Sequence, residues 1–255
     1  MTAVRLISVQ PFHAGLESGC VKGKRDVSCR MVGAAAKTGT SGKKQNKKKS
    51  LKSQDLMAWP TVSPKPSLKR DLSHSIHLFT VPDFLSQNEC EAFIRCADAR
   101  GLEHQGSGGP AKGEAFRDNE RLADYNPDLA NMLWQAGLRE SFHDIVLPGG
   151  RVAVGLNPNI RLYRYGLGQR FGPHYDESVD MDGGGATEFT LLIYLTGGLS
   201  GGETVFYERR KVVAEVAPVA GLALFHIHGA RCLLHEAKPV LKGVKYVLRS
   251  DVVFA

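Results

Sequence analysis

The sequence has no long hydrophobic run. Nothing in its 255 residues approaches the roughly 18 consecutive apolar residues that a transmembrane helix needs. The beginning of the chain also lacks the compact apolar core of a secretory signal peptide. We therefore expect a protein that neither enters a membrane nor is secreted.

Cysteine is sparse and scattered. The chain contains five cysteines, an odd number, and no CxxC pair. Disulfide frameworks and thiolate zinc sites depend on paired or clustered cysteines, so neither is expected. We predict reduced thiols at Cys20, Cys29, Cys90, Cys96 and Cys232.

Acidic residues are rare near the start of the chain. Residues 1–53 hold twelve Lys and Arg against two acids, a net charge of +10, whereas residues 54–255 carry a net charge of −3. The basic part includes "GKKQNKKKS" and has no sustained apolar period, so we expect a disordered tail over residues 1–58. It can serve as a nuclear-localisation signal, a weak nucleic-acid contact, an organelle transit peptide, or a solubilising tail without a specific reader. We predict a nuclear or cytoplasmic protein.

A Pro-rich stretch follows the tail. Each proline in "WPTVSPKPS" removes a backbone donor and biases the preceding residue towards extended structure. We predict a linker over residues 59–74 and one folded domain over residues 75–255.

Two segments carry helix signals. In residues 86–101, Ser86 and Glu89 have the spacing of a capping box and precede an apolar stripe. In residues 126–137, Asn126 is a suitable cap with a proline in the first turn. Both stripes are expected to pack against a core.

The sequence period changes after about residue 150. Short runs rich in β-branched and aromatic residues alternate with Gly or Pro, which predicts strands of a sandwich or jelly-roll barrel preceded by packing helices, an α+β fold. The expected strands lie within residues 159–166, 187–197, 202–208, 211–218, 221–229 and 244–254.

The stretch "RFGPHYDES" contains half of a metal site. His174 and Asp176 are two apart, so in an extended chain they lie on one face while Tyr175 points away. An imidazole and a carboxylate can then meet at one point. The alternative is a surface histidine beside a solvated acid.

"CLLHEAKPV" offers the third ligand, His235. Two histidines and one carboxylate on one face of an octahedral ion leave adjacent positions open, which is typical of non-haem Fe(II) oxygenases. A structural zinc would prefer a closed tetrahedron. The neighbouring carboxylate, Glu236, should point away from the site.

The final apolar run contains two cations. Lys245, Val247 and Arg249 share a strand face in "GVKYVLRSDVVF". Cations inside an apolar strand need partners if they are buried, and a small dicarboxylate lying on the metal would be one. Solvated surface charges are the alternative.

These stretches together resemble a known family. The order and spacing of "YGLGQRFGPHYD", "GGETVF" and "HEAKPVLKGVKY" are similar to those of the 2-oxoglutarate and Fe(II)-dependent dioxygenases, specifically the prolyl 4-hydroxylase catalytic domain. The resemblance covers about residues 75–255 and is strongest from residue 159. It implies a double-stranded β-helix, in agreement with the strand pattern.

The resemblance also implies a site. The H-x-D pair and the distal histidine of the family bind iron, which implies metal binding by His174, Asp176 and His235. The basic residue about ten positions later binds the distal carboxylate of 2-oxoglutarate, which implies Lys245, with Arg249 as the competing cation.

Two further residues complete the implied cosubstrate pocket. Tyr165 lies nine positions before the first histidine, where the family has a tyrosine that helps to hold the carboxylate, and Thr190 falls on a strand that lines the pocket. The implied cofactors are Fe(II), 2-oxoglutarate and L-ascorbate, with O2 as cosubstrate. The implied reaction hydroxylates a C–H bond, with release of succinate and CO2.

The substrate is less well defined. The absence of a signal peptide and the polybasic tail argue against collagen, so we expect a protein or peptide substrate with a residue such as proline, ahead of a small molecule. Residues 116–126 include Arg117, Asn119 and Arg121 where the family places substrate-facing residues, although an exposed polar connection is the preferred interpretation. Residues 177–188 could form a lid or a long loop.

Other functions stay open. His226 and His228 share a strand face and could form, with His235, the three-histidine site of a cupin-like metalloenzyme. A jelly-roll binding module without catalysis and an oxygenase acting on alkylated nucleic acid are further alternatives.

Overall fold

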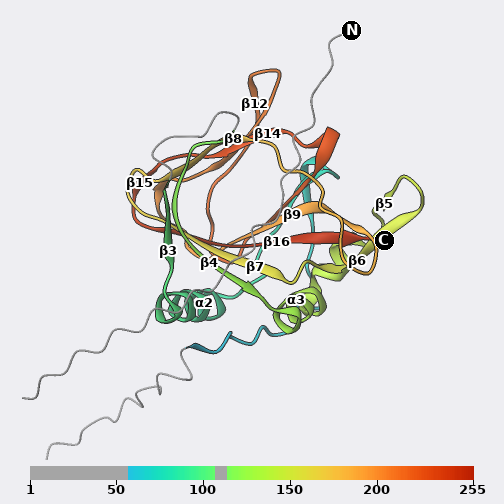
Figure 1. The fold of residues 1–255 in the computed structure, drawn as a ribbon, viewed down its shortest axis with the longest axis horizontal. Coiled ribbons are helices and arrows are strands. Elements are labelled where there is room, and N and C mark those ends of the chain that lie inside the picture. Colours follow the sequence, from blue (N-terminus) through green and yellow to red (C-terminus); the bar gives the residue numbers. More distant parts are fainter. Residues whose placement is uncertain (1–56, 107–113) are drawn as a thin grey trace, which may run out of the picture. The chain divides into compact units, whose positions relative to one another are not determined.

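The chain folds into a curled antiparallel sheet with two α-helices against its outer face (Figure 1). The computed structural model describes residues 57–106 and 114–255. All of these belong to one compact unit, Lys49–Ala255. Within them, no helix is long and apolar enough to cross a membrane.

Fourteen strands form the main sheet of the described residues. Its continuous path, in spatial order, is β1 (Asp71–Ser75), β2 (Leu78–Val81), β13 (Ala223–Ile227), β9 (Ala186–Tyr194), β16 (Lys245–Phe254), β7 (Asn159–Tyr165), β4 (Arg117–Tyr125), β8 (Arg170–His174), β14 (Leu234–Ala237), β11 (Thr204–Glu208) and β12 (Lys211–Val216).

The remaining strands lie off this path. Strand β3 (Glu103–Gly106) pairs with β4, and β6 (Arg151–Leu156) pairs with both β5 (Val146–Leu147) and β16. A separate two-stranded sheet joins β10 (Ser200–Gly201) and β15 (Val240–Lys242). The predicted jelly-roll architecture is therefore confirmed.

Side-chain alternation gives the central strands two different faces. On β16, Tyr246 and Leu248 belong to the large core beneath the helices, whereas Lys245, Val247 and Arg249 line an interior cavity. Strands β9 and β13 alternate in the same way, because successive side chains of a strand point to opposite faces. The outer face therefore builds the core and the inner face builds the site.

Aromatic side chains fill much of that core. The ring of Phe142 packs edge-on against the rings of Phe189, Phe225 and Phe254, with centroid distances of 5.4, 5.0 and 6.0 Å. Phe225 also stacks on Phe79 of β2 at 5.1 Å. Edge-to-face and offset arrangements at these distances are the favourable ones for aromatic pairs, so this cluster stabilises the sheet that carries the site.

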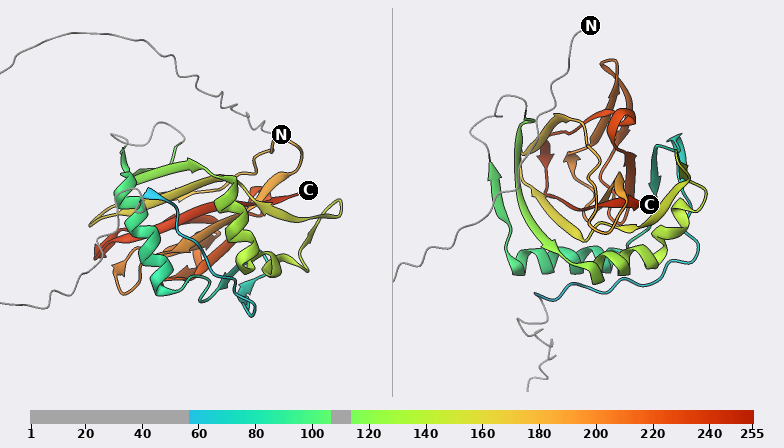
Figure 2. Two further views of the ribbon diagram at one scale, coloured as in Figure 1. Left: turned by 90° about the horizontal axis from the view of Figure 1, so that it is seen from below. Right: turned by 45° about the vertical axis from the view of Figure 1, so that its right-hand side comes forward.

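The first predicted helix is confirmed as α2 (Gln87–Arg100). Ser86 accepts a hydrogen bond from the backbone N–H of Glu89, and the Glu89 carboxylate accepts one from the backbone N–H of Ser86. This reciprocal pair is the capping box that the sequence predicted. Figure 2 shows the helices side by side along one face of the curled sheet.

The second predicted helix is shorter than expected. It begins as predicted, because Asn126 caps α3 (Pro127–Leu133) by accepting a hydrogen bond from Leu129 N. The chain then passes through a π-helical turn, η1 (Trp134–Leu138), and a 3-10 turn, η2 (Arg139–Phe142). Gly137 has a φ of +135°, a value that ends the regular helix and that only glycine adopts readily.

Residues 116–126 do not form the exposed polar connection that we preferred, so that interpretation is wrong. They contain β4, which pairs with β3, β7 and β8 in the middle of the sheet, and Asn119 is fully buried. Charge is tolerated there because Glu120 pairs with Arg164, its cross-strand neighbour on β7. The polar composition of this segment had therefore suggested a loop where the chain forms a strand.

The predicted linker lies partly against the helices. Trp59 Nε1 donates to Asp124 Oδ2 at 2.5 Å, and the Trp59 ring lies 6.2 Å from that of Phe93. Lys65 N donates to Ala136 O at 2.7 Å. The predicted domain limits stay predictions. Of the predicted tail, residues 1–56 lie outside the described residues.

Candidate functional site

Two histidines meet on neighbouring strands inside the curled sheet. His174 ends β8 and is the register partner of His235 on β14, and their ring centroids are 4.2 Å apart. The Nδ1 atom of each ring lies 2.9 Å from a backbone carbonyl two residues earlier, Gly172 O or Leu233 O. Since a carbonyl only accepts, each Nδ1 carries a proton, and Nε2 is the nitrogen of each ring that faces a metal.

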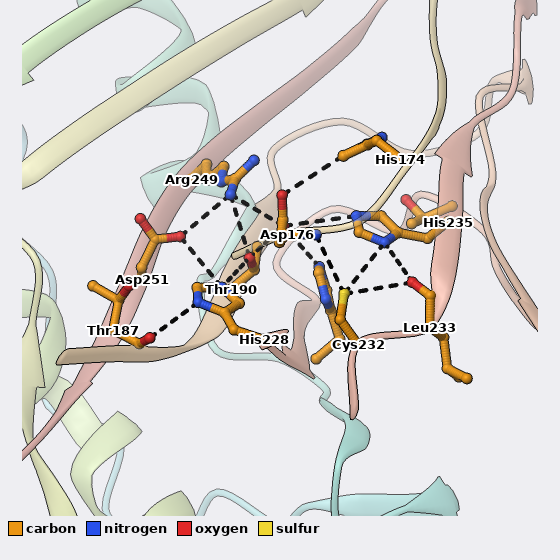
Figure 3. A network of polar contacts seen from close by, with 12 residues as sticks. His174, Asp176, Thr187, Thr190, His228, Cys232, Leu233, His235, Arg249 and Asp251 are labelled. Carbon is orange, nitrogen blue, oxygen red and sulfur yellow. Dashed lines mark hydrogen bonds and ion pairs between the residues drawn. The ribbon is translucent and has the colours of Figure 1, made fainter. Parts of the chain in front are cut away.

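Asp176 lies just beyond the end of β8 and faces both rings (Figure 3). Its Oδ1 is 3.7 Å from Nε2 of His174, and its Oδ2 is 3.6 Å from Nε2 of His235. The intervening Tyr175 is 60% exposed, so it points away as the alternation predicted. The structure thus brings the three predicted metal ligands together.

Three neighbours hold Asp176 in place. The Thr190 hydroxyl donates to Oδ2 at 2.6 Å, and the Arg249 guanidinium lies 3.0 Å from the same oxygen. The backbone N–H of Asp176 donates to Cys232 Sγ at 3.3 Å. Because these contacts engage Oδ2 and the backbone, Oδ1 is the carboxylate oxygen left free for a cation.

Electrostatics favour a cation between these side chains. Burial, helped by nearby His235, lowers the pKa of His174 to about 4, so this imidazole is neutral at pH 7. Burial raises the pKa of Asp176, but Arg249 and His235 outweigh it and hold that pKa well below its usual range. Burial likewise lowers the pKa of His235, but the contact with Asp176 outweighs it and raises that pKa to about 9, so a metal ion must displace the proton of Nε2 when it binds. The ionised carboxylate therefore attracts positive charge to the point between the rings.

The donor set fits a ferrous ion. One ligand atom from each of His174, Asp176 and His235 lies within 4.8 Å of the others. Two imidazoles and one carboxylate suit non-haem iron, and three protein ligands leave coordination positions for other groups.

The predicted cosubstrate anchor lies at the other end of the same cavity. Lys245 is 2% exposed, and its Nζ donates to Gly202 O at 2.6 Å. The ammonium lies 5.5 and 5.3 Å from the ring centroids of Tyr165 and Tyr194. Burial lowers its pKa to about 7 although Glu203 acts in the opposite direction, and no carboxylate of the described residues forms an ion pair with it. Such a cation needs an anionic partner.

Tyr165 and Thr190 both line this cavity. Tyr165 is the register partner of Lys245, so the two side chains lie side by side. The Thr190 hydroxyl is already engaged, because it donates to Asp176 and lies 2.8 Å from Nε2 of His228. Thr190 therefore acts on the site through Asp176, and Tyr165 acts at the lysine end.

Arg249 occupies a different environment from Lys245. Its guanidinium lies 3.0 Å from Asp176 and 3.4 Å from Asp251. Burial lowers the pKa of Arg249, but the two carboxylates outweigh it and raise that pKa above its ordinary value. Arg249 is partly buried and both carboxylates are buried, so the charge of Arg249 is compensated by the protein itself.

The three-histidine arrangement is not assembled. His228 is held away from the other two rings, with Nε2 beside Thr190 and Nδ1 3.2 Å from Thr187 O. Within the described ranges, no group of three potential ligand atoms within 4.8 Å includes His228. His226 does lie close to His235, with ring centroids 4.4 Å apart.

A groove opens on the outer side of the metal ligands. Its wall includes Arg117, whose guanidinium lies 4.1 Å from the centroid of the Phe171 ring, and that ring stacks on His174 at 3.7 Å. Arg117 therefore faces the site as the sequence suggested, whereas Asn119 is buried in the sheet and lies outside the groove.

Two residues of the site, Phe171 and Cys232, escaped the sequence analysis, and His226 was considered only as part of the three-histidine alternative. Each of the three lies against a predicted ligand. The spacing of Cys232 three residues before His235 was a usable signal. The contacts of Phe171 and His226 depend on strand pairing, which the residue pattern does not fix.

Comparisons with known proteins agree with this geometry. Residues 160–250 match the model of the 2OG-Fe(II) oxygenase superfamily. The chain is 25% identical over 197 residues to prolyl 4-hydroxylase 13 of Arabidopsis thaliana, covering 69% of this chain and 70% of that protein.

Two solved structures show the same fold. One is a prolyl-4-hydroxylase of Pseudomonas putida, with 18% identity, a TM-score of 0.52 and coverage of 71% of this chain and 93% of that one. The other is the viral collagen prolyl hydroxylase of Paramecium Bursaria Chlorella virus-1, with 23% identity, a TM-score of 0.50 and coverage of 69% and 96%. In sequence the chain is therefore similar to the 2OG-Fe(II) oxygenase superfamily over residues 160–250, and overall it is prolyl 4-hydroxylase-like.

Proposed function

We propose that this dioxygenase hydroxylates a C–H bond of a peptidyl residue, with proline as the first candidate, and converts 2-oxoglutarate and O2 to succinate and CO2. The observation that carries this proposal is the buried, uncompensated ammonium of Lys245 in the same cavity as the His174, Asp176 and His235 cluster. One end of the cavity suits a divalent cation and the other suits a carboxylate, which matches a small keto acid with a second carboxylate.

The three clustered side chains are the proposed iron ligands. His174 and His235 offer Nε2 because their Nδ1 protons are donated to backbone carbonyls. Asp176 offers Oδ1, while Thr190 and Arg249 hold its other oxygen. A bound ferrous ion supplies the activation of O2 that is coupled to oxidative decarboxylation of the keto acid.

Lys245 is the proposed anchor of 2-oxoglutarate. Its ammonium would donate to the distal carboxylate, and the buried Tyr165 ring beside it limits access of water. Fixing the far end of the cosubstrate orients its reactive end at the metal ligands. Arg249 is the weaker candidate, because two carboxylates already neutralise it.

A peptide substrate is supported by the outer groove. Phe171, His174 and Asp176 line both the inner cavity and this groove, so a side chain lying in the groove would reach the metal ligands. The wall carries both charge signs, with Arg117 and Glu177 among its residues, which suits the polar backbone of an extended peptide. Proline is chosen because the curated relative is named a prolyl 4-hydroxylase.

Ascorbate and the cellular location are further proposals. L-ascorbate would keep the iron ferrous between turnovers. The basic segment of residues 1–53, with a net charge of +10, would direct a nuclear or cytoplasmic location or make a weak nucleic-acid contact, and an organelle transit peptide is the alternative.

The test is a coupled turnover assay. The full chain is incubated with ferrous iron, 2-oxoglutarate, ascorbate and a panel of proline-containing peptides, each matched to a copy with alanine in place of proline. We expect succinate formation stimulated by some proline peptides and an added oxygen atom on the proline by mass spectrometry. Succinate without any peptide oxidation would overturn the peptidyl-proline proposal, and no succinate at all would favour a binding module.

A further inference from the structure

A second set of metal ligands lies beside the proposed iron site. Ligand atoms of His226, Cys232 and His235 also lie within 4.8 Å of one another, and all three side chains are buried. The set shares His235 with the iron ligands but replaces a carboxylate with a thiol. It therefore differs from the iron site in the type of metal that it suits.

The imidazole of His226 is buried without a hydrogen-bond partner. The residue is 3% exposed, and neither of its ring nitrogens has a hydrogen-bond partner. Its Nε2 points to the site, 3.6 Å from Asp176 Oδ2. A buried imidazole without any hydrogen bond is costly unless a ligand uses it.

Cys232 contributes a soft ligand to the same place. It is a free cysteine with 6% exposure, and its sulfur lies 4.0 Å from Nδ1 of His235 (Figure 3). Its Sγ accepts a hydrogen bond from Asp176 N at 3.3 Å. One thiolate and two imidazoles are a ligand set typical of zinc.

The distances permit a tetrahedral ion after a small movement. Zinc lies about 2.3 Å from sulfur and about 2.0–2.1 Å from nitrogen, so its ligand atoms are about 3.3–3.6 Å apart. The three atoms are at most 4.8 Å apart, so side-chain rotations that close the set by about 1 Å would suffice.

We propose that His226, Cys232 and His235 form a second metal site that binds zinc and excludes iron. The nitrogen of His235 that lies 4.0 Å from Cys232 Sγ is Nδ1, which donates its proton to Leu233 O in the metal-free protein. Zinc at Nδ1 would leave the remaining ring proton on Nε2, so His235 would no longer offer iron a lone pair there. Binding converts the Cys232 thiol to a thiolate and releases its proton to solvent.

Cobalt(II) is the probe that separates the two sites. Thiolate coordination gives cobalt an intense near-ultraviolet charge-transfer band, which nitrogen and oxygen ligands do not give. We expect this band when the metal-free full chain is titrated with cobalt, its retention in Cys96→Ser, and its loss in Cys232→Ser. Cys96 is the matched control, because it is also a buried free cysteine, but it lies in α2.

Asp176→Ala separates this proposal from the proposed function. The variant should lose ferrous iron but keep the cobalt band, since its carboxylate is not one of the three ligands. Iron binding with no cobalt band in the wild-type chain would overturn the second site and leave the iron site intact. A cobalt band without iron binding would overturn the proposed iron site and leave the second site intact.

Zinc affinity gives the quantitative test. We expect Cys232→Ser to weaken zinc binding, measured by competition with a chromophoric chelator, by at least about tenfold, the loss seen even for outer partners of metal ligands. The affinity for iron should change far less. If Cys232→Ser does not fold, as judged by thermal unfolding, His226→Ala decides, with the same loss expected. Unchanged zinc affinity in a folded variant would mean that zinc merely replaces iron at His174, Asp176 and His235.

Discussion

The two cations on the inner face of β16 have opposite surroundings. Lys245 donates to one backbone carbonyl and forms no ion pair within the described ranges, whereas Arg249 lies within 3.4 Å of two carboxylates, Asp176 and Asp251. Their pKa values move in opposite directions, because burial lowers that of Lys245 to about 7 while the carboxylates raise that of Arg249. Lys245 and Arg249 are only four positions apart on β16, yet the charge of Arg249 is neutralised by carboxylates and that of Lys245 is not.

This difference separates structure from function. A buried ion pair holds its surroundings in place, and losing one partner is strongly destabilising. A buried cation without a counter-ion destabilises the empty protein and is retained where a ligand supplies the opposite charge. On this basis Arg249 positions Asp176, and Lys245 awaits a carboxylate.

The largest effect is expected from Asp176→Ala. The change removes the anionic metal ligand and one of the two carboxylates of Arg249. Ferrous iron binding by equilibrium dialysis and succinate formation should both fall to background. Asp180→Ala is the control, because Asp180 is an exposed acid four residues further along. Retained iron and turnover, combined with loss of both in His226→Ala, would favour a cupin-like site instead.

Arg249→Met should produce the largest loss of stability. Asp176 would keep the Thr190 hydroxyl but lose its cation, and the expected decrease in the free energy of unfolding is roughly 3–5 kcal/mol. Lys245→Met should be far milder, because it removes a buried charge that has no counter-ion. Urea unfolding of the two variants measures the difference, and equal losses would erase the distinction between the two cations.

The affinity for 2-oxoglutarate should depend on pH through Lys245. The ammonium binds the carboxylate, and the free protein loses this proton as the pH rises through about 7. Above that pH, each pH unit should weaken binding by up to about tenfold. The decline should end once the pH exceeds the pKa of Lys245 in the complex, which the bound carboxylate raises. Calorimetric titrations from about pH 6 to 9 test this. Lys245→Met should bind weakly with little pH dependence, and an unchanged slope in that variant would assign the proton elsewhere.

The smallest effect is expected from removing the basic tail. Deletion of residues 1–55 removes the net positive charge of the chain but none of the residues that line the cavity. Succinate formation should remain at the full-length level, while the cellular distribution of a fluorescent fusion should change. A large loss of turnover would mean that the domain boundary was predicted in the wrong place.

Local patterns predicted much of this architecture. Alternation on the last strand predicted that Lys245, Val247 and Arg249 share a face, and all three line the cavity. The pattern could not tell the two cations apart, because their difference lies in Asp176 and Asp251, and Asp176 comes from a different part of the chain. Local spacing therefore predicts which side chains share a face but not which charges are paired.

Strand pairing set the limits of the sequence analysis. The polar segment of β4 was misread because the partner of Glu120 is on β7, and His226 was considered only together with His228. In the structure the His228 side chain bonds to Thr190 and Thr187, which leaves His226 beside Cys232 and His235. Each case depends on contacts between strands that are distant in the sequence.

The most direct test of the account is the dissociation constant of 2-oxoglutarate at neutral pH with saturating manganese(II) in place of iron. It is compared in the wild-type chain, Lys245→Ala and Arg249→Ala. Losing a charge-assisted contact costs on the order of 2 kcal/mol, so Lys245→Ala should weaken binding more than tenfold without changing manganese affinity, and Arg249→Ala should weaken it less. A loss confined to Arg249→Ala, with Lys245→Ala unchanged, would contradict the account.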